Sequence, residues 1–372
     1  MPNPILTQAI DALASRRDLS ADETAEVLAE IMHGDASETQ IAGFLIALRT
    51  KGETVEELVG LARTMRTLAA HVPVAREGLL DTAGTGGGNP TFNVSTTAAL
   101  IAAGAGCAVA KHGNRSATSR SGSADLLEAL GARIDLTPER VAGCIEAVGF
   151  GFMFAPAHHQ ATRFVVPVRR ELAVRTIFNL LGPLANPAGA RRQLLGVSDP
   201  RFLETVAGAL AQLGTDRALV VSSDDGLDEI SASAATHVIE VNGEELRRYV
   251  LRPEGIGVDA STDGNGAAKH SEPPAELRGG APAQNAAITR AILEGEPGAQ
   301  AELAIVNAGA AVYAAGSSAT IAEGVEMARE ALARGLAADA LERYLRASHG
   351  EILAADQLQS ADQELQPGAG SR

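Results

Sequence analysis

Residues 78–103 read GLLDTAGTGGGNPTFNVSTTAALIAA, and this stretch decides the fold. The apolar run at 78–83 predicts a β-strand, a glycine-rich turn follows, and the pattern from about 92 to 103 predicts a helix. Glycines accept positive φ and let backbone amides approach a ligand, and a helix N-terminus offers unpaired N–H groups. The stretch therefore predicts an anion-binding turn. It is neither a Walker nor a dinucleotide motif, because GKS/GKT and the G-x-G-x-x-G spacing are absent.

Polar side chains after the glycines strengthen this interpretation. Asn93, Ser95 and Thr96 follow the turn directly and add amide and hydroxyl groups to the amides of the helix N-terminus. A glycine turn alone is weak evidence for anion binding. The combination indicates a cradle for phosphate groups.

Beyond this stretch, short apolar runs alternate with helical patterns, which implies parallel βαβ units. Residues 160–190 interrupt the alternation with a longer helical stretch and the turn LLGPLANPAGA, and 252–285 predict a long surface excursion. We expect further strands at 107–110, 133–136, 151–155 and 218–222, and helices at 121–130, from Thr137-Pro138 onward, and at about 284–313 and 318–334.

The first seventy residues predict a bundle of helices with no chemistry of its own. Apolar residues recur there at helical spacing. Three pairs have the spacing of a capping box, in which a hydroxyl and a Glu or Gln side chain cap a helix start: Ser20 with Glu23, Ser37 with Gln40, and Thr54 with Glu57.

Composition limits the class of protein. The chain has 372 residues, of which 45% are hydrophobic, so a large core and about two domains are expected. Its formal net charge of −15 argues against a main role in binding nucleic acid or anionic membranes. No leader peptide or membrane span is predicted. Cys107 and Cys144 lie in alanine-rich contexts and are interpreted as small core residues, so we expect a cytoplasmic protein.

A second anion-binding loop is predicted at residues 111–123, which read KHGNRSATSRSGS. Three cations and four serines lie between an expected strand and an expected helix, where open α/β sheets bind ligands. The alternative is a solvated basic loop. In a chain of net charge −15, a local concentration of positive charge beside glycine and serine favours the functional interpretation.

Two further segments carry chemical groups. His158 and His159 precede Arg163 and Arg169, and an arginine fork can hold a planar carboxylate by two hydrogen bonds. Histidines are often plain core or surface residues, so Arg169 is the stronger candidate. Residues 224–229 read DDGLDE after the strand at 218–222, and carboxylates at a strand end suit Mg²⁺ that also binds substrate phosphates. The alternative there is a solvated acidic turn.

Taken together, these segments resemble the anthranilate phosphoribosyltransferase family, which belongs to the glycosyltransferases related to pyrimidine nucleoside phosphorylases. The resemblance covers roughly residues 5–345. The motifs that carry it are GTGG followed by NVST, KHGNRS with SGSAD, RTIFNLLGPLANPA, and DGLDEIS.

The resemblance implies an α/β fold with a small helical N-terminal domain and a larger α/β domain, whose mainly parallel sheet is flanked by helices. The helical domain is expected at 1–72, joined in space by about 165–190. The α/β domain is expected at 73–355, and 356–372 is expected to be a disordered tail. The implied reaction transfers phosphoribose from 5-phosphoribosyl diphosphate to the amino group of anthranilate, in tryptophan biosynthesis. Mg²⁺, two ions per monomer, and a homodimer formed through the helical domain are also implied, with no nucleic acid or membrane partner.

The family's functional positions carry over onto this chain in four groups. Lys111 and Arg169 take the catalytic positions. Ser95, Asp228 and Glu229 fall on the Mg²⁺ positions. The anthranilate site corresponds to Gly84, Asn114, His159, Arg169 and Gly182. The 5-phosphoribosyl diphosphate site corresponds to Gly84, Gly87, Gly88, Thr91, Asn93, Val94, Ser95, Thr96, Lys111, His112, Gly113, Asn114, Arg115, Ser116, Ser119 and Ser123.

One departure and two rival functions complete the sequence-based picture. The family usually has GTGGD and one more residue before the NVST-like stretch, whereas this chain has Gly88 in place of the acidic residue and a loop one residue shorter. A pyrimidine nucleoside phosphorylase-like enzyme shares the architecture, but it needs neither the DGLDEIS carboxylates nor Arg169. A non-catalytic, nucleic-acid-binding paralogue conflicts with the negative charge.

Overall fold

The computed structural model describes residues 2–116, 120–256 and 275–351. Its helices are α1 (Pro4–Ala14), α2 (Ala21–His33), α3 (Glu38–Lys51), α4 (Val55–Thr67), α5 (Val94–Gly104), α6 (Ser123–Leu130), α7 (Pro138–Val148), α8 (Ala155–His158), α9 (Val166–Leu172), α10 (Phe178–Leu184), α11 (Leu203–Gln212), α12 (Pro282–Leu293), α13 (Ala299–Ala314), α14 (Ile321–Ala333) and α15 (Leu336–Ser348). Its strands are β1 (Leu80–Gly84), β2 (Val109–Gly113), β3 (Phe150–Phe154), β4 (Arg192–Gly196), β5 (Arg217–Ser223), β6 (Thr236–Asn242) and β7 (Glu245–Leu251).

A seven-stranded sheet with the order β3-β2-β1-β4-β5-β6-β7 forms the centre of the larger part. The strands from β3 to β5 in this order pair in parallel, and β6 and β7 add an antiparallel edge. The chain turns to opposite sides of β1, because β2 lies beside it on one side and β4 on the other. Such a switch point opens a crevice at the carboxyl ends of the strands.

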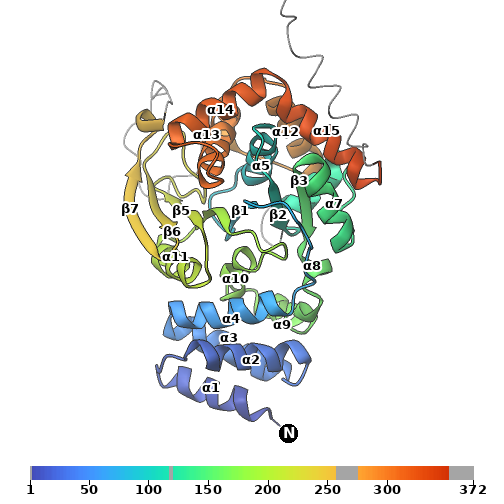
Figure 1. The fold of residues 1–372 in the computed structure, drawn as a ribbon. Coiled ribbons are helices and arrows are strands. Elements are labelled where there is room, and N and C mark those ends of the chain that lie inside the picture. The colour runs from blue at the N-terminus through green and yellow to red at the C-terminus, as the bar shows by residue number, and fades with distance from the viewer. Residues whose placement is uncertain (1, 117–119, 257–274, 352–372) are drawn as a thin grey trace, which may run out of the picture.

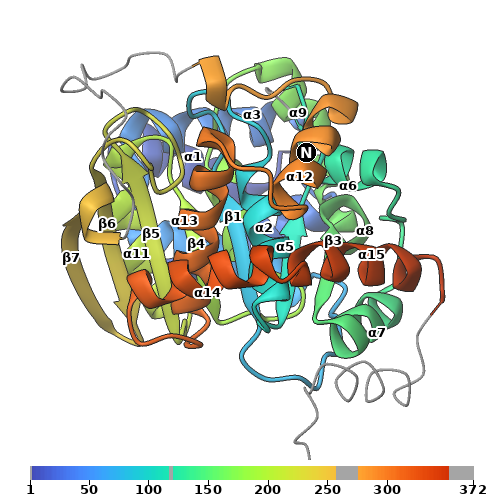
Figure 2. The same ribbon diagram turned by 90° about the horizontal axis from the view of Figure 1, so that it is seen from above.

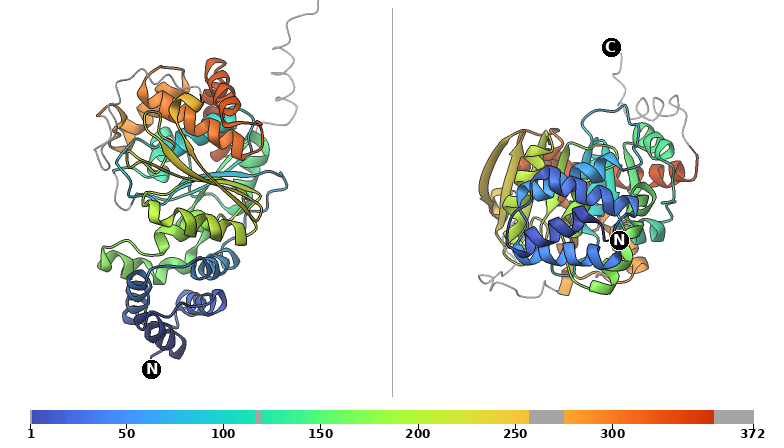
Figure 3. Two further views of the ribbon diagram at one scale, coloured as in Figure 1. Left: turned by 90° about the vertical axis from the view of Figure 1, so that its left-hand side faces the viewer. Right: turned by 90° about the horizontal axis from the view of Figure 1, so that it is seen from below.

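Successive side chains along the strands point to opposite faces of the sheet and pack into two hydrophobic cores, one on each face. On β5, Leu219 and Val221 join the core formed with α5 and α12–α15, whereas Ala218 and Val220 join the core formed with α11 and the helices of the N-terminal part. Figure 1 and the left view of Figure 3 show these layers above and below the sheet. Seen from above in Figure 2, α14 and α15 run across the sheet.

The smaller part is a helical domain in which distant segments pack together. Helices α1–α4 lie at one end of the molecule, and α9 and α10 contact α3 and α4, respectively (Figure 1). Arg66 of α4 contacts both parts, because its Nε donates to Leu184 O (2.7 Å) of α10 and its Nη1 donates to Leu213 O (3.1 Å) directly after α11. The fold is thus a small helical domain beside a larger α/β domain with a mostly parallel sheet. Among the described residues, no helix is long and apolar enough to cross a membrane.

The structure confirms two of the expected capping boxes and half of the third. Ser20 with Glu23 and Thr54 with Glu57 exchange both hydrogen bonds. The hydroxyl of Ser37 accepts from the amide of Gln40, but the Gln40 side chain instead pairs with the backbone of Asn3, at 3.0 Å from Oε1 to N and 2.8 Å from Nε2 to O. Packing against α1 therefore takes the glutamine away from the box.

Several expected elements differ in the structure. Residues 133–136 form no strand, although Ile134 and Leu136 are buried in the core. The helix expected at 284–313 is two helices, α12 and α13, because Gly295 and Gly298 adopt positive φ between them. Residue 282 already begins α12, so the end of the expected surface excursion is helical, and residues 257–274 of that excursion lie outside the described residues. The expected disordered tail at 356–372 also lies outside them.

Candidate active site

A cavity of about 970 Å³ lies at the carboxyl ends of β1, β2 and β5, and α8–α10 line its opposite side. It brings together every sequence-predicted site residue that the structure describes. These are Gly84, Gly87, Gly88, Thr91, Asn93, Val94, Ser95, Thr96, Lys111, His112, Gly113, Asn114, Arg115, Ser116, Ser123, His159, Arg169, Gly182, Asp228 and Glu229. Ser119 lies outside the described residues.

The glycine loop, residues 84–93, connects β1 to α5 and forms one wall of the cavity. Gly86 and Gly87 adopt φ of +65° and +85°, a region that L side chains rarely occupy. The Gly86 N–H donates to Asp228 Oδ2 (3.2 Å), and a Cβ added at Gly84 would lie 2.6 Å from the same oxygen. Glycines are therefore required where the loop approaches the carboxylate.

Lys111 of β2 is buried at the floor of the cavity. Its Nζ donates to Thr82 O (2.5 Å) and lies 3.2 Å from Thr82 Oγ1 and 3.4 Å from Ser95 Oγ. Burial lowers the pKa of Lys111 to about 8, while the nearby Asp81 carboxylate works in the opposite direction. Lys111 thus places an ammonium group beside the start of α5.

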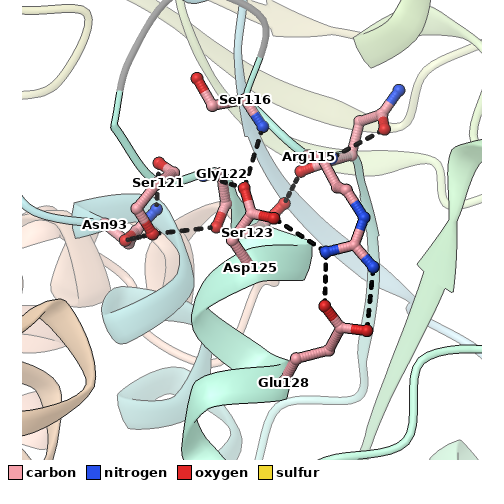
Figure 4. A network of polar contacts seen from close by, with 9 residues as sticks. Asn93, Arg115, Ser116, Ser121, Gly122, Ser123, Asp125 and Glu128 are labelled. Carbon is pink, nitrogen blue, oxygen red and sulfur yellow. Dashed lines mark hydrogen bonds and ion pairs between the residues drawn. The ribbon is translucent and has the colours of Figure 1, made fainter. Parts of the chain in front are cut away.

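The second loop follows β2 and is held by Asp125 of α6. One carboxylate oxygen of Asp125 accepts from the backbone N–H groups of Ser116 (3.1 Å) and Gly122 (2.8 Å), and the other accepts from Arg115 Nη1 (2.9 Å). Figure 4 shows this network, in which Arg115 also pairs with Glu128. Asp125 and Glu128 thus pair with Arg115 in this structure, and its contact with 5-phosphoribosyl diphosphate stays a prediction.

Asn93 joins the two loops. Its Nδ2 donates to Ser121 O (3.0 Å), and its Oδ1 accepts from Ser121 Oγ (3.0 Å), as Figure 4 shows. The same Oδ1 accepts from Asn285 Nδ2 (2.7 Å). Its side chain does not cap α5. The expected hydrogen-bonding group therefore acts within the protein, where it fixes both loops around the start of the helix.

Two histidines, His112 of β2 and His159 directly after α8, line the cavity. The rings of His112 and His159 lie 5.1 Å apart, and His112 Nδ1 donates to the carbonyl oxygen of Gly182 (3.1 Å). Burial lowers the pKa of His112 to about 3 and that of His159 to about 4. Both rings are therefore neutral near pH 7. No described residue pairs with the buried Nε2 atom of either ring.

Arg169 extends from α9 toward the same region. Its guanidinium lies 5.4 Å from the centre of the Phe178 ring, and its Nη2 lies 3.5 Å from Asn179 Oδ1. Among the described residues, no carboxylate forms an ion pair with Arg169. The arrangement leaves the guanidinium fork open for a carboxylate of a ligand.

The acidic loop, residues 224–229, separates into structural and cavity-facing carboxylates. Asp225 accepts from Ser223 Oγ (2.5 Å) and Ser231 Oγ (2.6 Å), and Asp224 pairs with His237 (2.9 Å). Asp228 and Glu229 line the cavity instead.

The cavity-facing pair has electrostatic properties that suit a cation. Burial raises the pKa of both groups, and the charges of Asp228 and Asp225 raise the pKa of Glu229 further. No described residue pairs with Glu229 Oε2. Among the described residues, no group of three His, Cys, Asp or Glu side chains could by itself hold a metal ion. Two carboxylates alone do not complete the coordination shell of a metal ion. Such a pair suits Mg²⁺, which in proteins is usually bound by one or two carboxylates together with substrate phosphates.

Sequence reasoning missed Arg175, Asp81 and Asn179. Arg175 donates to Gly86 O through Nη1 and to Thr85 O through Nη2 (3.2 Å). Asp81 is buried and accepts from Asn186 Nδ2 (2.7 Å) and from the N–H of His112 (3.1 Å). The RTIFN motif contained both Arg175 and Asn179, so its polar positions were the available signal.

Comparisons with known proteins agree with this geometry. Residues 7–69 match the glycosyl transferase family, helical bundle domain, and residues 76–338 match the glycosyl transferase family, a/b domain. Anthranilate phosphoribosyltransferase from Rubrobacter xylanophilus is 50% identical over 346 residues, which cover 92% of this chain and 98% of that protein. The chain belongs to the anthranilate phosphoribosyltransferase family.

Solved structures of the anthranilate phosphoribosyltransferase family share the fold. The crystal structure of the Thermus thermophilus protein has a TM-score of 0.84 and 46% identity, covering 92% of this chain and 99% of that one. The Saccharomyces cerevisiae enzyme in complex with PRPP and Mg has a TM-score of 0.81 and 26% identity, covering 93% of this chain and 98% of that one. The fold of both domains is therefore that of the family.

Proposed function

We propose that this enzyme transfers the 5-phosphoribosyl group from 5-phosphoribosyl diphosphate (PRPP) to the amino group of anthranilate, releasing diphosphate, in tryptophan biosynthesis. The convergence of Lys111, Ser95, Asp228 and Glu229 on one cavity carries the proposal. These residues come from different elements that parallel-sheet topology places at one edge. They combine anion-binding and cation-binding groups, as a magnesium-bound diphosphate requires.

The residues present fit Mg²⁺. Asp228 and Glu229 have raised pKa values, Glu229 Oε2 is without a described partner, and the Ser95 hydroxyl lies on the same cavity. Ser95, Asp228 and Glu229 would hold the metal, which neutralises diphosphate charge when bound. Yeast relatives carry Mg in their structures. We propose two ions per monomer.

The chain's own residues position the substrates and stabilise charge. The transition state at the anomeric carbon should resemble an oxocarbenium ion, with negative charge growing on the leaving diphosphate. Lys111 and the amides of the glycine loop face that charge in the arrangement proposed here. Arg169, with Asn114, would orient the anthranilate carboxylate beside His159. The aromatic amine is already neutral at pH 7, so a strong general base is not obligatory.

Three further proposals concern the setting of this reaction. Homodimers would form through the helical domain. The reaction would occur in the cytoplasm, which agrees with the two buried free cysteines. The domain division at 72/73, with about 165–190 joining the helical domain, is supported by the contacts of α9 with α3 and of α10 with α4.

A fluorescence assay that follows anthranilate consumption tests the function. We expect consumption only when PRPP and Mg²⁺ are both present, because the proposed site needs a metal-bound diphosphate. Thymidine with inorganic phosphate serves as the comparison. Phosphorolysis of thymidine without anthranilate consumption would refute the proposal and favour the phosphorylase alternative.

A further inference from the structure

Hydrogen bonds join the glycine loop to the acidic loop. The N–H of Asn89 donates to Gly226 O (3.0 Å), and Asn89 Nδ2 donates to Asp225 O (2.7 Å). The Gly86 N–H donates to Asp228 Oδ2 (3.2 Å). Asn89 thus supplies two of these bonds, one from its backbone and one from its side chain. Both bonds end on the turn that precedes the cavity-facing carboxylates.

The acidic loop is shaped to receive Asn89. Gly226 adopts a φ of +80°, and a Cβ added there would lie 2.8 Å from Asn89 Nδ2. The carboxylate of Asp225 is fixed by Ser223 and Ser231, so its backbone carbonyl has a defined position. The asparagine side chain therefore lies against a turn whose positive φ at residue 226 favours glycine.

The composition of the glycine loop permits this close approach. A Cβ added at Gly88 would lie 2.8 Å from Asp228 Oδ1 and 3.1 Å from Gly226 O. An aspartate at this position would place a third carboxylate against Asp228, in a region where burial already raises the pKa of that group. Gly88 and the short loop thus bring Asn89 directly onto the acidic loop.

We propose that Asn89 is a positioning residue that couples PRPP binding to Mg²⁺ binding, a role that rests on the proposed function. Its two hydrogen bonds hold the amides that face diphosphate and the carboxylates that face Mg²⁺ as one unit. The ligand that binds first then orders its own loop and, through these hydrogen bonds, the other loop, so the second ligand loses less conformational freedom on binding. Asn89 itself need not touch the reacting atoms.

Calorimetric titration with PRPP, without anthranilate, measures this coupling in the absence of turnover. The dissociation constant is measured in saturating Mg²⁺ and in EDTA, and the factor by which Mg²⁺ tightens PRPP binding reports the coupling. Asn89→Ala should lower this factor by about fivefold, because a hydrogen bond that fixes the acidic loop is lost. Asn89→Asp keeps the shape but replaces the donor with an acceptor facing Asp225 O, so it should lower the factor as well. The KM for anthranilate should stay within about twofold in both variants.

Gln212→Ala is the matched control, because Gln212 donates a side-chain amide to Glu56 (2.8 Å) far from the cavity. Its coupling factor should equal that of the unsubstituted protein. Unchanged factors in the Asn89 variants would overturn the positioning role while leaving the proposed function intact. Failure of the unsubstituted protein to bind PRPP would refute the proposed function and this inference with it. Asn89→Asp keeps the test available if Asn89→Ala does not fold.

Discussion

Arg169 illustrates how one side chain can decide which substrate is recognised. Its guanidinium faces the cavity with Phe178 and Asn179 as neighbours, and no described carboxylate neutralises it. A planar fork held in this way fits a planar carboxylate by two charge-assisted hydrogen bonds. Such a contact acts on the acceptor substrate and not on the diphosphate.

Arg169→Ala should therefore raise the anthranilate KM about 10- to 100-fold, the range expected for losing hydrogen bonds to a charged group. The KM for PRPP should change much less, because Lys111 and the glycine loop lie elsewhere in the cavity. Steady-state kinetics with each substrate varied in turn measures both constants. Equal increases in the two constants would contradict the assignment of Arg169 to the anthranilate carboxylate.

Glu229 makes stability depend on pH, and the sign follows from its raised pKa. The folded protein binds this proton more tightly than the unfolded chain, so the contribution of Glu229 to stability is full below its ordinary pKa of 4.5. That contribution is lost as pH rises through the raised value. The ionised group then costs folding free energy because it is buried beside Asp228 and Asp225.

Glu229→Gln should raise the Tm at neutral pH in metal-free buffer, by roughly 2 °C for each kcal/mol recovered. The difference should vanish at pH values below the ordinary pKa of 4.5, where both the folded and the unfolded protein carry protonated Glu229. The same variant should need at least about tenfold more Mg²⁺ for half-maximal activity. Melting curves across pH give the first result. A Tm of Glu229→Gln at neutral pH that is equal to or lower than that of the unsubstituted protein would show that ionised Glu229 does not destabilise the folded state.

At the scale of elements, loop positions depend on a few side chains that lie after the strands. Asp125 is a clear case. Its carboxylate accepts one backbone N–H hydrogen bond from each side of the loop after β2 and also pairs with Arg115 (Figure 4). The loop's ends are thereby fixed at the start of α6, next to the cavity. Loss of the Asp125 carboxylate should therefore affect both the stability of the protein and its binding of diphosphate.

Asp125→Ala should lower the free energy of unfolding by about 1–2 kcal/mol, because two backbone donors and a helix cap lose their acceptor. The KM for PRPP should rise about fivefold for the same reason. Asp135→Ala removes a carboxylate that pairs with an arginine on the exposed surface, so it is the matched control and should change stability by less than about 1 kcal/mol. Urea denaturation and kinetics measure the two effects. Equal loss of stability in both variants would contradict a specific role for Asp125.

The sequence predicted some elements well because their start signals are local. The strand before the glycine loop, the strand at β5 and the capped helices α2, α4 and α7 have such signals. Strand β4 was missed because its five residues follow directly on an arginine-rich turn. Strands β6 and β7 were missed although they form a local hairpin, because the Asn242-Gly243 turn signal between them was not used. Residues 133–136 had strand-like residues but no neighbouring strand with which to pair.

The candidate site divides in the same way. Residues inside contiguous motifs, such as Ser95, Lys111 and Glu229, were identified by sequence and share one cavity. Arg175 was missed because its partners, Thr85 and Gly86, are 90 and 89 residues away along the chain. Nor does the sequence reveal that Arg115 pairs with Asp125 and Glu128, because those ion pairs depend on the orientation of α6. The sequence therefore predicted which groups lie within one motif, but not which groups from distant segments pair with each other.

At the scale of the whole molecule, the two domains each supply one side of the cavity. Arg169 and Gly182 belong to α9 and α10, which pack with the N-terminal helices, and the phosphate-facing loops follow the strands. A chain of contacts links the two sides, because Arg49 of α3 donates to Arg175 O (2.7 Å) and the Arg175 side chain donates to Thr85 O and Gly86 O. The position of the helical domain is thus connected to the glycine loop.

Arg175→Ala should consequently affect both substrates, unlike Arg169→Ala. We expect the KM for PRPP to rise about tenfold, because the glycine loop loses two hydrogen bonds to a charged donor, and the anthranilate KM to rise by a smaller factor. Arg201→Ala provides the matched control, since Arg201 lies near Arg175 on the exposed surface and, within the described part of the chain, its side chain pairs with Asp199. Kinetics of the two variants with each substrate varied decides the matter. If Arg175→Ala changed only the KM for anthranilate, the helical domain would affect binding of anthranilate alone. Arg175 would then not connect that domain to the diphosphate-binding glycine loop.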